Sequence, residues 1–207
     1  MPHVSAAERR PQLIAAAVDL MAREGVAAGS TRAIAAELGV AQATVHYTFG
    51  TKADLYRAVL ESLTVKLHDG VLEAVQRAAG LEEALRATAD VFWEDLCDRP
   101  EYNLLWQELL TFALRQPDLR GVVHRFHAEL AQTAADAFGD VAVRTGVTYA
   151  VPATELATFL MAGLDGVCMS LLLSGGEPSA ATRRALDQVI AATLGLASGA
   201  VPARPTA

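Results

Sequence analysis

The stretch from Thr31 to Lys52, TRAIAAELGVAQATVHYTFGTK, has the pattern of two short helices joined by a tight turn. Ser30 or Thr31 can cap the first helix, because either hydroxyl can accept a hydrogen bond from a free amide at a helix start. Gly39 follows the last residue of this helix and can take the left-handed conformation that ends a helix. Residues 42–48 then form a second helix of about two turns.

The second helix is predicted to present polar side chains outward, because Val45 faces the first helix. This is the helix-turn-helix plan, in which the second helix enters the major groove of DNA. Gln42 stands at its start, and a glutamine can form a bidentate pair with N6 and N7 of adenine. Lys52 lies at a helix N-terminus, which favours a phosphate. The alternative interpretation of the same pattern is an ordinary surface helix.

The stretch Arg9–Leu63 resembles the DNA-binding domain of the tetracycline-repressor (TetR) family. The residues that carry the resemblance stand at the family's spacing: Thr31, Ile34, Ala35, Gly39, Val40, Thr44, Tyr47, Phe49, Lys52 and Leu55. His46 and Thr48 depart from the aromatic and histidine residues that are commoner in the family, so the resemblance assigns them no particular role. The expected DNA-contacting residues are Thr31, Arg32, Gln42, Ala43, Thr44, His46, Tyr47, Thr48 and Lys52.

The charge of the chain is unevenly distributed along the sequence. The formal net charge is −7, which is unusual for a protein that binds DNA. Residues 1–66 contain 7 Lys and Arg against 6 Asp and Glu, whereas residues 67–207 contain 10 against 18. A net charge of +1 in residues 1–66 is a weak electrostatic attraction for DNA. We therefore expect affinity to come from a dimer that places two such surfaces on DNA at once.

The rest of the sequence predicts helices and no strands. The first helix should begin near Pro11, because proline is tolerated in the first turn. A long helix from Lys52 to Ala78 would link the DNA-binding region to the rest of the chain. Further helices are expected at about 81–96, 105–113, 122–144, 154–173 and 179–198.

The predicted fold class is therefore all-α, with an N-terminal three-helix helix-turn-helix domain and a C-terminal six-helix ligand-binding and dimerisation domain. The expected divisions are residues 1–50 for DNA binding, residues 51–198 for ligand binding and dimerisation, and residues 199–207 as a disordered tail. Apolar residues make up 52% of the chain, which is too high a fraction for a disordered protein.

Aromatic and apolar residues in the second domain would line the space between its helices. They form either a ligand cavity or a packed core, because buried tryptophan fits both. The resemblance favours a cavity for a small, largely apolar effector, with His127 or Asp165 as polar anchor. For Asp165 a dimer-interface or capping role is an equal alternative. The predicted lining residues are Phe92, Trp93, Leu96, Trp106, Leu109, Phe126, His127, Met161 and Asp165.

Two other functions deserve comparison with a ligand-responsive regulator. One is an enzyme that uses His124, His127, Cys168 or Asp165, but no nucleophile–base spacing or cofactor motif supports it. The other is a regulator with a closed core and no small ligand. His124 and His127 share a helix face, yet a metal site needs more ligands than these two. We therefore predict no catalytic residue, no metal and no cofactor.

Small residues recur every four positions at Ala162, Gly166 and Ser170, which lets helices approach closely. With the last helix they predict a four-helix interface in a homodimer. No apolar run is long enough to span a bilayer, which takes about 18 residues, and the N-terminus lacks the apolar segment of a signal peptide. We expect a cytoplasmic protein without a membrane partner, and we expect Cys97 and Cys168 to be buried free thiols.

The resemblance implies a transcriptional repressor that binds double-stranded DNA at a palindromic operator as a homodimer. A small-molecule effector would release it by shifting the long helix at Lys52–Ala78 and so changing the separation of the two recognition helices.

Overall fold

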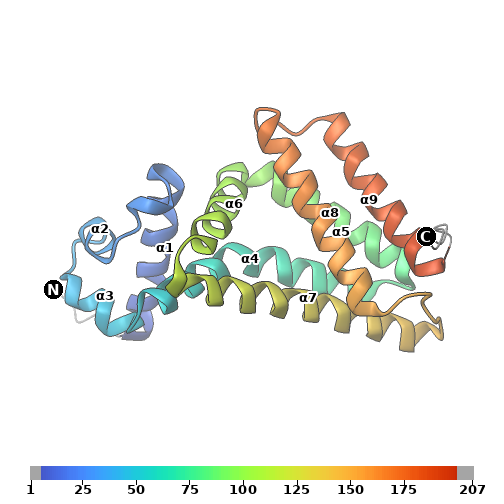
Figure 1. The fold of residues 1–207 in the computed structure, drawn as a ribbon, viewed down its shortest axis with the longest axis horizontal. Helices are drawn as coiled ribbons and strands as arrows, with labels where there is room; N and C mark the ends of the chain where they lie inside the picture. Colours follow the sequence, from blue (N-terminus) through green and yellow to red (C-terminus); the bar gives the residue numbers. More distant parts are fainter. Residues whose placement is uncertain (1–5, 200–207) are drawn as a thin grey trace. The chain divides into compact units, whose positions relative to one another are not determined.

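The computed structural model describes residues 6–199. Over this range the chain forms nine α-helices and one short 3-10 helix, and no strand, which confirms the predicted all-α fold (Figure 1). The predicted tail lies outside the described residues except for Gly199. The elements are α1 Ala6–Glu24, η1 Val26–Ala28, α2 Thr31–Glu37, α3 Gln42–Phe49, α4 Lys52–Arg77, α5 Leu81–Asp98, α6 Pro100–Leu114, α7 Pro117–Thr145, α8 Ala153–Leu173 and α9 Ala180–Ser198.

The chain divides into two compact units. The first contains the chain up to Lys66 together with Glu101–Phe126, and the second contains Leu67–Pro100 and the chain from His127 onward. Helices α4 and α7 each contribute to both units. The predicted boundary after residue 50 divides a DNA-binding part from a ligand-binding part, which is a different criterion from compact packing. This functional boundary stays a prediction.

In the first unit, α1 packs against η1, α2 and α3. Its core includes Met21, Ile34 and Val45, whose side chains are fully buried. Ser30 caps α2 by accepting a hydrogen bond from the Ala33 amide, as the sequence predicts. Gly39 follows α2 with a φ of 66°, a left-handed conformation that residues with a Cβ rarely adopt. The two predicted signals at the ends of α2 are thus confirmed.

Helix α1 begins at Ala6 and not near Pro11, so the predicted start is wrong. Pro11 lies inside α1, where it lacks the N–H that would bond the carbonyl four residues earlier, and the turn before it is nevertheless helical. Two arginines of the early part are held by side-chain contacts. Arg9 donates to Gln12 at 3.0 Å, and the Arg10 guanidinium lies 4.9 Å from the centre of the Phe49 ring.

Both ends of α4 are fixed by side chains. At the start, Thr51 accepts a hydrogen bond from the Asp54 amide at 3.1 Å and so caps the helix. At the end, the Arg144 guanidinium donates to three backbone carbonyls of residues 75, 76 and 78, at 2.7 to 3.1 Å. The last carbonyls of a helix lack intrahelical partners, so Arg144 takes the place of the missing donors. This side chain belongs to α7 and joins the end of α4 to it.

The second unit is organised around α8 and α9, which form an antiparallel pair, with α5 against α9 (Figure 1). Ser179 caps α9 by accepting from the Thr182 amide. Gly163 makes the close approach of the pair possible, because a Cβ there would lie 2.4 Å from Cγ1 of Val189. The core of this unit contains Leu85, Phe92, Leu96, Phe138, Leu156, Leu160, Val167, Leu171, Leu186 and Ile190.

Helix α8 corrects the expectation that no apolar run is long enough to span a bilayer. Ala153–Leu173 is 21 residues long with a mean hydropathy of 1.9, sufficient by length and composition alone. A core helix of a globular protein satisfies the same two criteria. On α8, Leu156, Leu160 and Leu171 are buried, whereas Phe159 and Leu173 are exposed. In a single chain only 33% of its most apolar stretch is covered, so one face of this helix is apolar and open.

Candidate nucleic-acid interface

The recognition helix α3 separates a buried side from an exposed side. Val45 and Phe49 are buried against the rest of the first unit. Gln42 and Tyr47 are exposed, with Tyr47 at 86% the most exposed of these. Among the other predicted contact residues, Arg32, Ala43, His46 and Lys52 are exposed, whereas Thr31, Thr44 and Thr48 are half-buried. The sequence therefore placed the polar residues on the uncovered side, and their contacts with DNA remain predictions.

Three of these side chains contact one another. The Gln42 amide nitrogen Nε2 donates to Oγ1 of Thr31 at 3.1 Å and lies 3.4 Å from Nε2 of His46. Oγ1 of Thr31 lies 3.5 Å from the same His46 nitrogen. Gln42 and His46 share a face because they are four residues apart on α3, and Thr31 begins α2 beside them. We call Thr31, Gln42 and His46 the polar triad.

The hydroxyl group of Thr48 on α3 is engaged by the helix backbone. Thr48 donates its hydroxyl hydrogen to the carbonyl of Thr44 at 2.8 Å, one turn back along the helix. That hydroxyl oxygen keeps an acceptor site, but its hydrogen is used inside the helix. A donor contact from Thr48 to a phosphate would first break this bond.

Lys52 rests on two aromatic rings. Its ammonium nitrogen lies 5.2 Å from the centre of the Tyr56 ring and 5.7 Å from that of Phe112. The two rings stack on each other with centres 6.0 Å apart. An exposed contact of this kind contributes roughly 0.5–1 kcal/mol, little enough for a phosphate to compete for the lysine. The side chain is thus held near the start of α4 with its charge exposed.

Glu108 of α6 contacts the turn before the helix-turn-helix, and sequence reasoning did not find it. Its carboxylate oxygen Oε1 accepts a hydrogen bond from the Val26 amide at 2.9 Å, at the start of η1. Glu108 also acts on Tyr56. Burial, followed by the negative charge of Glu108, raises the pKa of Tyr56 to about 12. No spacing rule marks Glu108, because its partner lies 82 residues away along the chain.

The predicted effector residues fall into two sets, one in each unit. In the first unit the Trp106 and Phe126 rings lie 6.1 Å apart at a tilt of 59°, and Leu109 is buried. In the second unit Phe92 and Leu96 belong to the packed core. His127, Met161 and Asp165 are half-buried, and Asp165 has interactions with its surroundings. Whether the two sets line one cavity stays a prediction.

Trp93 has a cation beside its ring. The Arg183 guanidinium lies 5.7 Å from the ring centre and also pairs with Asp90 at 2.7 Å and Asp187 at 3.2 Å. The hydrogen bond to Asp90 is the main cause that raises the pKa of Arg183. Arg183 therefore stays charged, and it connects α9 to α5 across the second unit.

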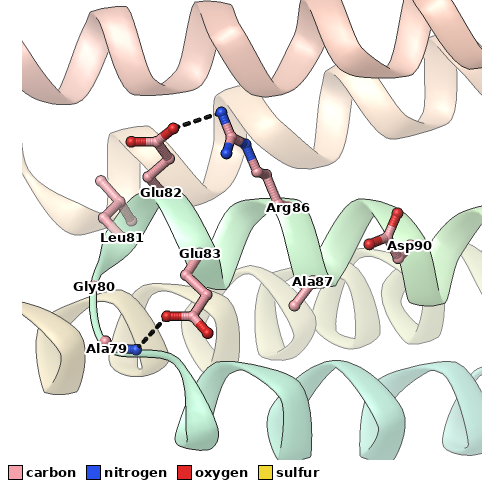
Figure 2. A pocket seen from close by; sticks show the side chains of 8 residues that line it. All are labelled: Ala79, Gly80, Leu81, Glu82, Glu83, Arg86, Ala87 and Asp90. Carbon is pink, nitrogen blue, oxygen red and sulfur yellow. Dashed lines mark hydrogen bonds and ion pairs between the residues drawn. The ribbon is translucent and has the colours of Figure 1, made fainter.

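An open groove of about 670 Å³ lies at the start of α5 (Figure 2). Glu82 pairs with Arg86 at 2.5 Å, and Glu83 accepts a hydrogen bond from the Ala79 amide at 2.9 Å. No aromatic side chain lines it, and none of the predicted effector residues does. Its lining consists of Ala79, Gly80, Leu81, Glu82, Glu83, Arg86, Ala87 and Asp90.

The described residues contain no cluster of three or more His, Cys, Asp or Glu side chains that could hold a metal ion. His124 is exposed and His127 is half-buried on α7. Both cysteines are free thiols, as expected, but only Cys168 is buried. Cys97 is exposed because it lies on the outer side of the last turn of α5, so the expectation that it is buried was wrong.

Comparison with known proteins matches both parts of the chain to family models. Residues 13–59 match the model of bacterial regulatory proteins of the tetR family, and residues 81–195 match that of the BetI-type transcriptional repressor C-terminal domain. The HTH-type nicotine-responsive transcriptional repressor HdnoR of Paenarthrobacter nicotinovorans is 27% identical over 176 residues, 84% of this chain and 89% of that protein.

Two solved structures share the fold. A putative TetR-family transcriptional regulator from Rhodococcus sp. superposes with a TM-score of 0.75 at 23% identity, over 93% of this chain and all of that one. A putative transcriptional regulator from Saccharomonospora viridis in complex with choline gives a TM-score of 0.68 at 25% identity, over 89% of this chain and 96% of that one.

A helix-turn-helix with an uncovered polar side, followed by a helical domain, defines a DNA-binding transcriptional regulator. The chain belongs to the TetR family, with a C-terminal domain of the BetI type. TetR proteins are regulators and not enzymes, which rules out the enzyme that the sequence left as an alternative. They bind operator DNA, and a protein with this role works inside the cell.

Proposed function

We propose that this protein is a cytoplasmic repressor that binds a palindromic operator as a homodimer and releases it when a small effector enters the C-terminal domain. The observation that supports operator reading is the polar triad of Thr31, Gln42 and His46 on the uncovered side of the helix-turn-helix. Tyr47 and Lys52 flank it with exposed side chains suited to phosphates.

The proposed homodimer is supported by the open face of α8. Ala162, Gly166 and Ser170 are exposed there, next to the exposed apolar side chains of Phe159 and Met169. A Cβ at Gly166 would meet nothing within 4 Å in the single chain, so the glycine is not required by packing inside one subunit. Pairing α8 and α9 of two subunits would cover this face and place two recognition helices on two half-sites.

Sedimentation of the purified protein at micromolar concentration tests the dimer directly. The expected result is a dimer for the natural chain and monomers or aggregates for Gly166→Leu, because a leucine would force the two α8 helices apart. A matched control is Gly139→Leu, on α7, where a Cβ also meets nothing within 4 Å. A natural chain that sediments as a stable folded monomer would contradict the two-half-site proposal.

For the effector we propose a small, mostly apolar organic molecule that carries a nitrogen. HdnoR is named as nicotine-responsive, and the S. viridis regulator was solved with choline. Within the second unit, Trp93 and Met161 suit the apolar part, and His127 or Asp165 suits the polar part. Binding would act on DNA affinity only if the effector prefers one arrangement of α4 over another, since equal affinity for both shifts nothing.

The test begins with selection of an operator from a random duplex library by the full-length protein. Operator affinity should fall steeply with salt, and Lys52→Ala should make the slope of log affinity against log salt shallower by about 1 per subunit. Choline and nicotine are then titrated against the complex. A coupling of about 1–3 kcal/mol would weaken operator binding 5- to 150-fold. Trp93→Ala should reduce this response and leave operator affinity without effector nearly unchanged.

A regulator with a closed core and no small ligand is the second candidate. The observation that favours it is the packing of Phe92 and Leu96 into the core of the second unit, where both side chains are buried. Operator binding that no small molecule in a broad panel weakens would support this candidate over the ligand-gated repressor.

A further inference from the structure

The hydrogen bonds of the polar triad limit what Gln42 can offer to a base. A primary amide has two hydrogens on Nε2 and an acceptor oxygen Oε1. One hydrogen points to Thr31 at 3.1 Å, and the second acceptor within reach is Nε2 of His46 at 3.4 Å. With the His46 tautomer that carries its proton on Nδ1, both hydrogens of the nitrogen have partners inside the protein, and Oε1 is the part left for DNA.

The donors of Gln42 and Thr31 can each find one acceptor when DNA is present. Neutral His46 has one lone pair, on Nε2 if its proton is on Nδ1. Thr31 and Gln42 both lie within reach of that lone pair, at 3.5 and 3.4 Å. If Thr31 donates its hydroxyl hydrogen to a phosphate, the lone pair of His46 is left to Gln42. The two amide hydrogens of Gln42 and the hydroxyl hydrogen of Thr31 then each have one acceptor, and the amide is held in one orientation.

We propose that Gln42 reads its base pair through Oε1 alone, with its amide nitrogen retained by Thr31 and His46. An acceptor in the major groove selects an exocyclic amino group, which is N6 of adenine or N4 of cytosine. This differs from the bidentate pair with adenine, which also needs a donor from Nε2 to N7. His46 is then a positioning residue: it touches no base and sets which group of Gln42 does. The inference rests on operator binding by α3.

The experiment uses the full-length protein and its selected operator. Gln42→Ala first identifies the base pair at which specificity relaxes. If that base is adenine, it is replaced in one duplex by 7-deazaadenine, which lacks N7, and in another by unsubstituted purine, which lacks the amino group. The natural protein should tolerate loss of N7 within about 2-fold in Kd and lose about 10-fold or more without the amino group. If the pair is G·C, its guanine is replaced by 7-deazaguanine, and the natural protein should tolerate this loss of N7 within about 2-fold in Kd, because Oε1 would accept from N4 of cytosine.

Variants of His46 separate positioning from packing. The side chain is exposed, so His46→Leu should fold normally. It removes the acceptor and frees one amide hydrogen, so loss of N7 should now cost about 5-fold or more. His46→Gln restores an acceptor oxygen near the position of Nε2 and should restore tolerance of 7-deazaadenine. Gln42→Ala should bind both modified duplexes equally.

Two results would overturn the inference. One is a loss of about 10-fold in the natural protein when N7 is removed, since Nε2 would then be in contact with the base. The other is a G·C pair at which 7-deazaguanine costs the natural protein about 10-fold, since a contact to N7 of guanine requires a donor from Nε2. Failure to select any operator would instead contradict the proposed function, so the two failures are distinguishable.

Discussion

The polar triad and the core of the second unit are assembled over different distances along the chain. Thr31, Gln42 and His46 lie at most 15 residues apart, and local turns bring them together. In the second unit Arg183 reaches Asp90 over 93 residues, and Leu85 shares a core with Ala197. A surface built from nearby residues follows from helix caps and spacing, whereas a core built from distant helices depends on how side chains fit. Substitutions in the two regions should therefore differ in kind.

The largest effect should come from Gly163→Ala, which tests the close packing of the second unit. A Cβ would lie 2.4 Å from the branched side chain of Val189, which has little freedom to move away. We expect the free energy of unfolding to fall by about 1–3 kcal/mol. Gly139→Ala is the control, since its Cβ meets nothing within 4 Å and alanine favours helix. Equal urea midpoints for the two variants would mean that α8 and α9 can separate at little cost.

Glu108→Ala tests a long-range contact inside the first unit. Loss of the carboxylate leaves the Val26 amide without its partner, and we expect a cost of about 1–2 kcal/mol. Glu108→Gln keeps an acceptor oxygen and should lose less. Hydrogen exchange of the Val26 amide reports the contact directly and should accelerate only in the alanine variant. If the amide stays protected in both, the first unit is held together by local contacts alone.

Arg144→Met removes the donor to three carbonyls at the end of α4. Because these groups are partly open to water, we expect a cost of about 1 kcal/mol, seen as faster exchange in the last turn of α4. The control is Arg77→Met, which breaks only an exposed pair with Glu73 and should change stability by a few tenths of a kcal/mol. Similar losses of stability in the two variants would show that Arg144 contributes no more than an exposed ion pair does.

The smallest effect at neutral pH is expected for Tyr56→Phe. The pKa of Tyr56 is raised from 10.0 to about 12, so below pH 10 both the folded and the unfolded chain keep the proton. As pH rises from 10 towards 12, the unfolded chain loses the proton first and the natural protein loses stability. Urea unfolding of Tyr56→Phe should match the natural protein at pH 7 and decline less between pH 10 and 12. Parallel curves over this range would show that the hydroxyl ionises freely in the folded state.

Sequence patterns identified the helices and the exposed side of α3 because both depend on local rules. Ser30, Gly39 and Ser179 each fix a helix end through a side chain or backbone property of one residue. The start of α1 was missed because proline was treated as a boundary. The contacts of Glu108 and Gly163 carry no sequence signal, since their partners are 82 residues away and on the neighbouring helix respectively. The effector stays a proposal for the same reason. Helical periodicity shows which side chains face inward, but it does not show whether they surround a ligand or which ligand that would be.

The open apolar face of α8 has a consequence for newly made chains. In the proposed homodimer, folding of one chain is a first-order event, whereas covering that face with a second chain is second-order and slows as the protein becomes scarce. At low concentration each new subunit would spend an interval with a membrane-length apolar helix only 33% covered. During that interval the chain is a substrate for chaperones, proteases and aggregation. Regulator abundance would then rise more than proportionally with synthesis, because pairing protects the chains that find a partner.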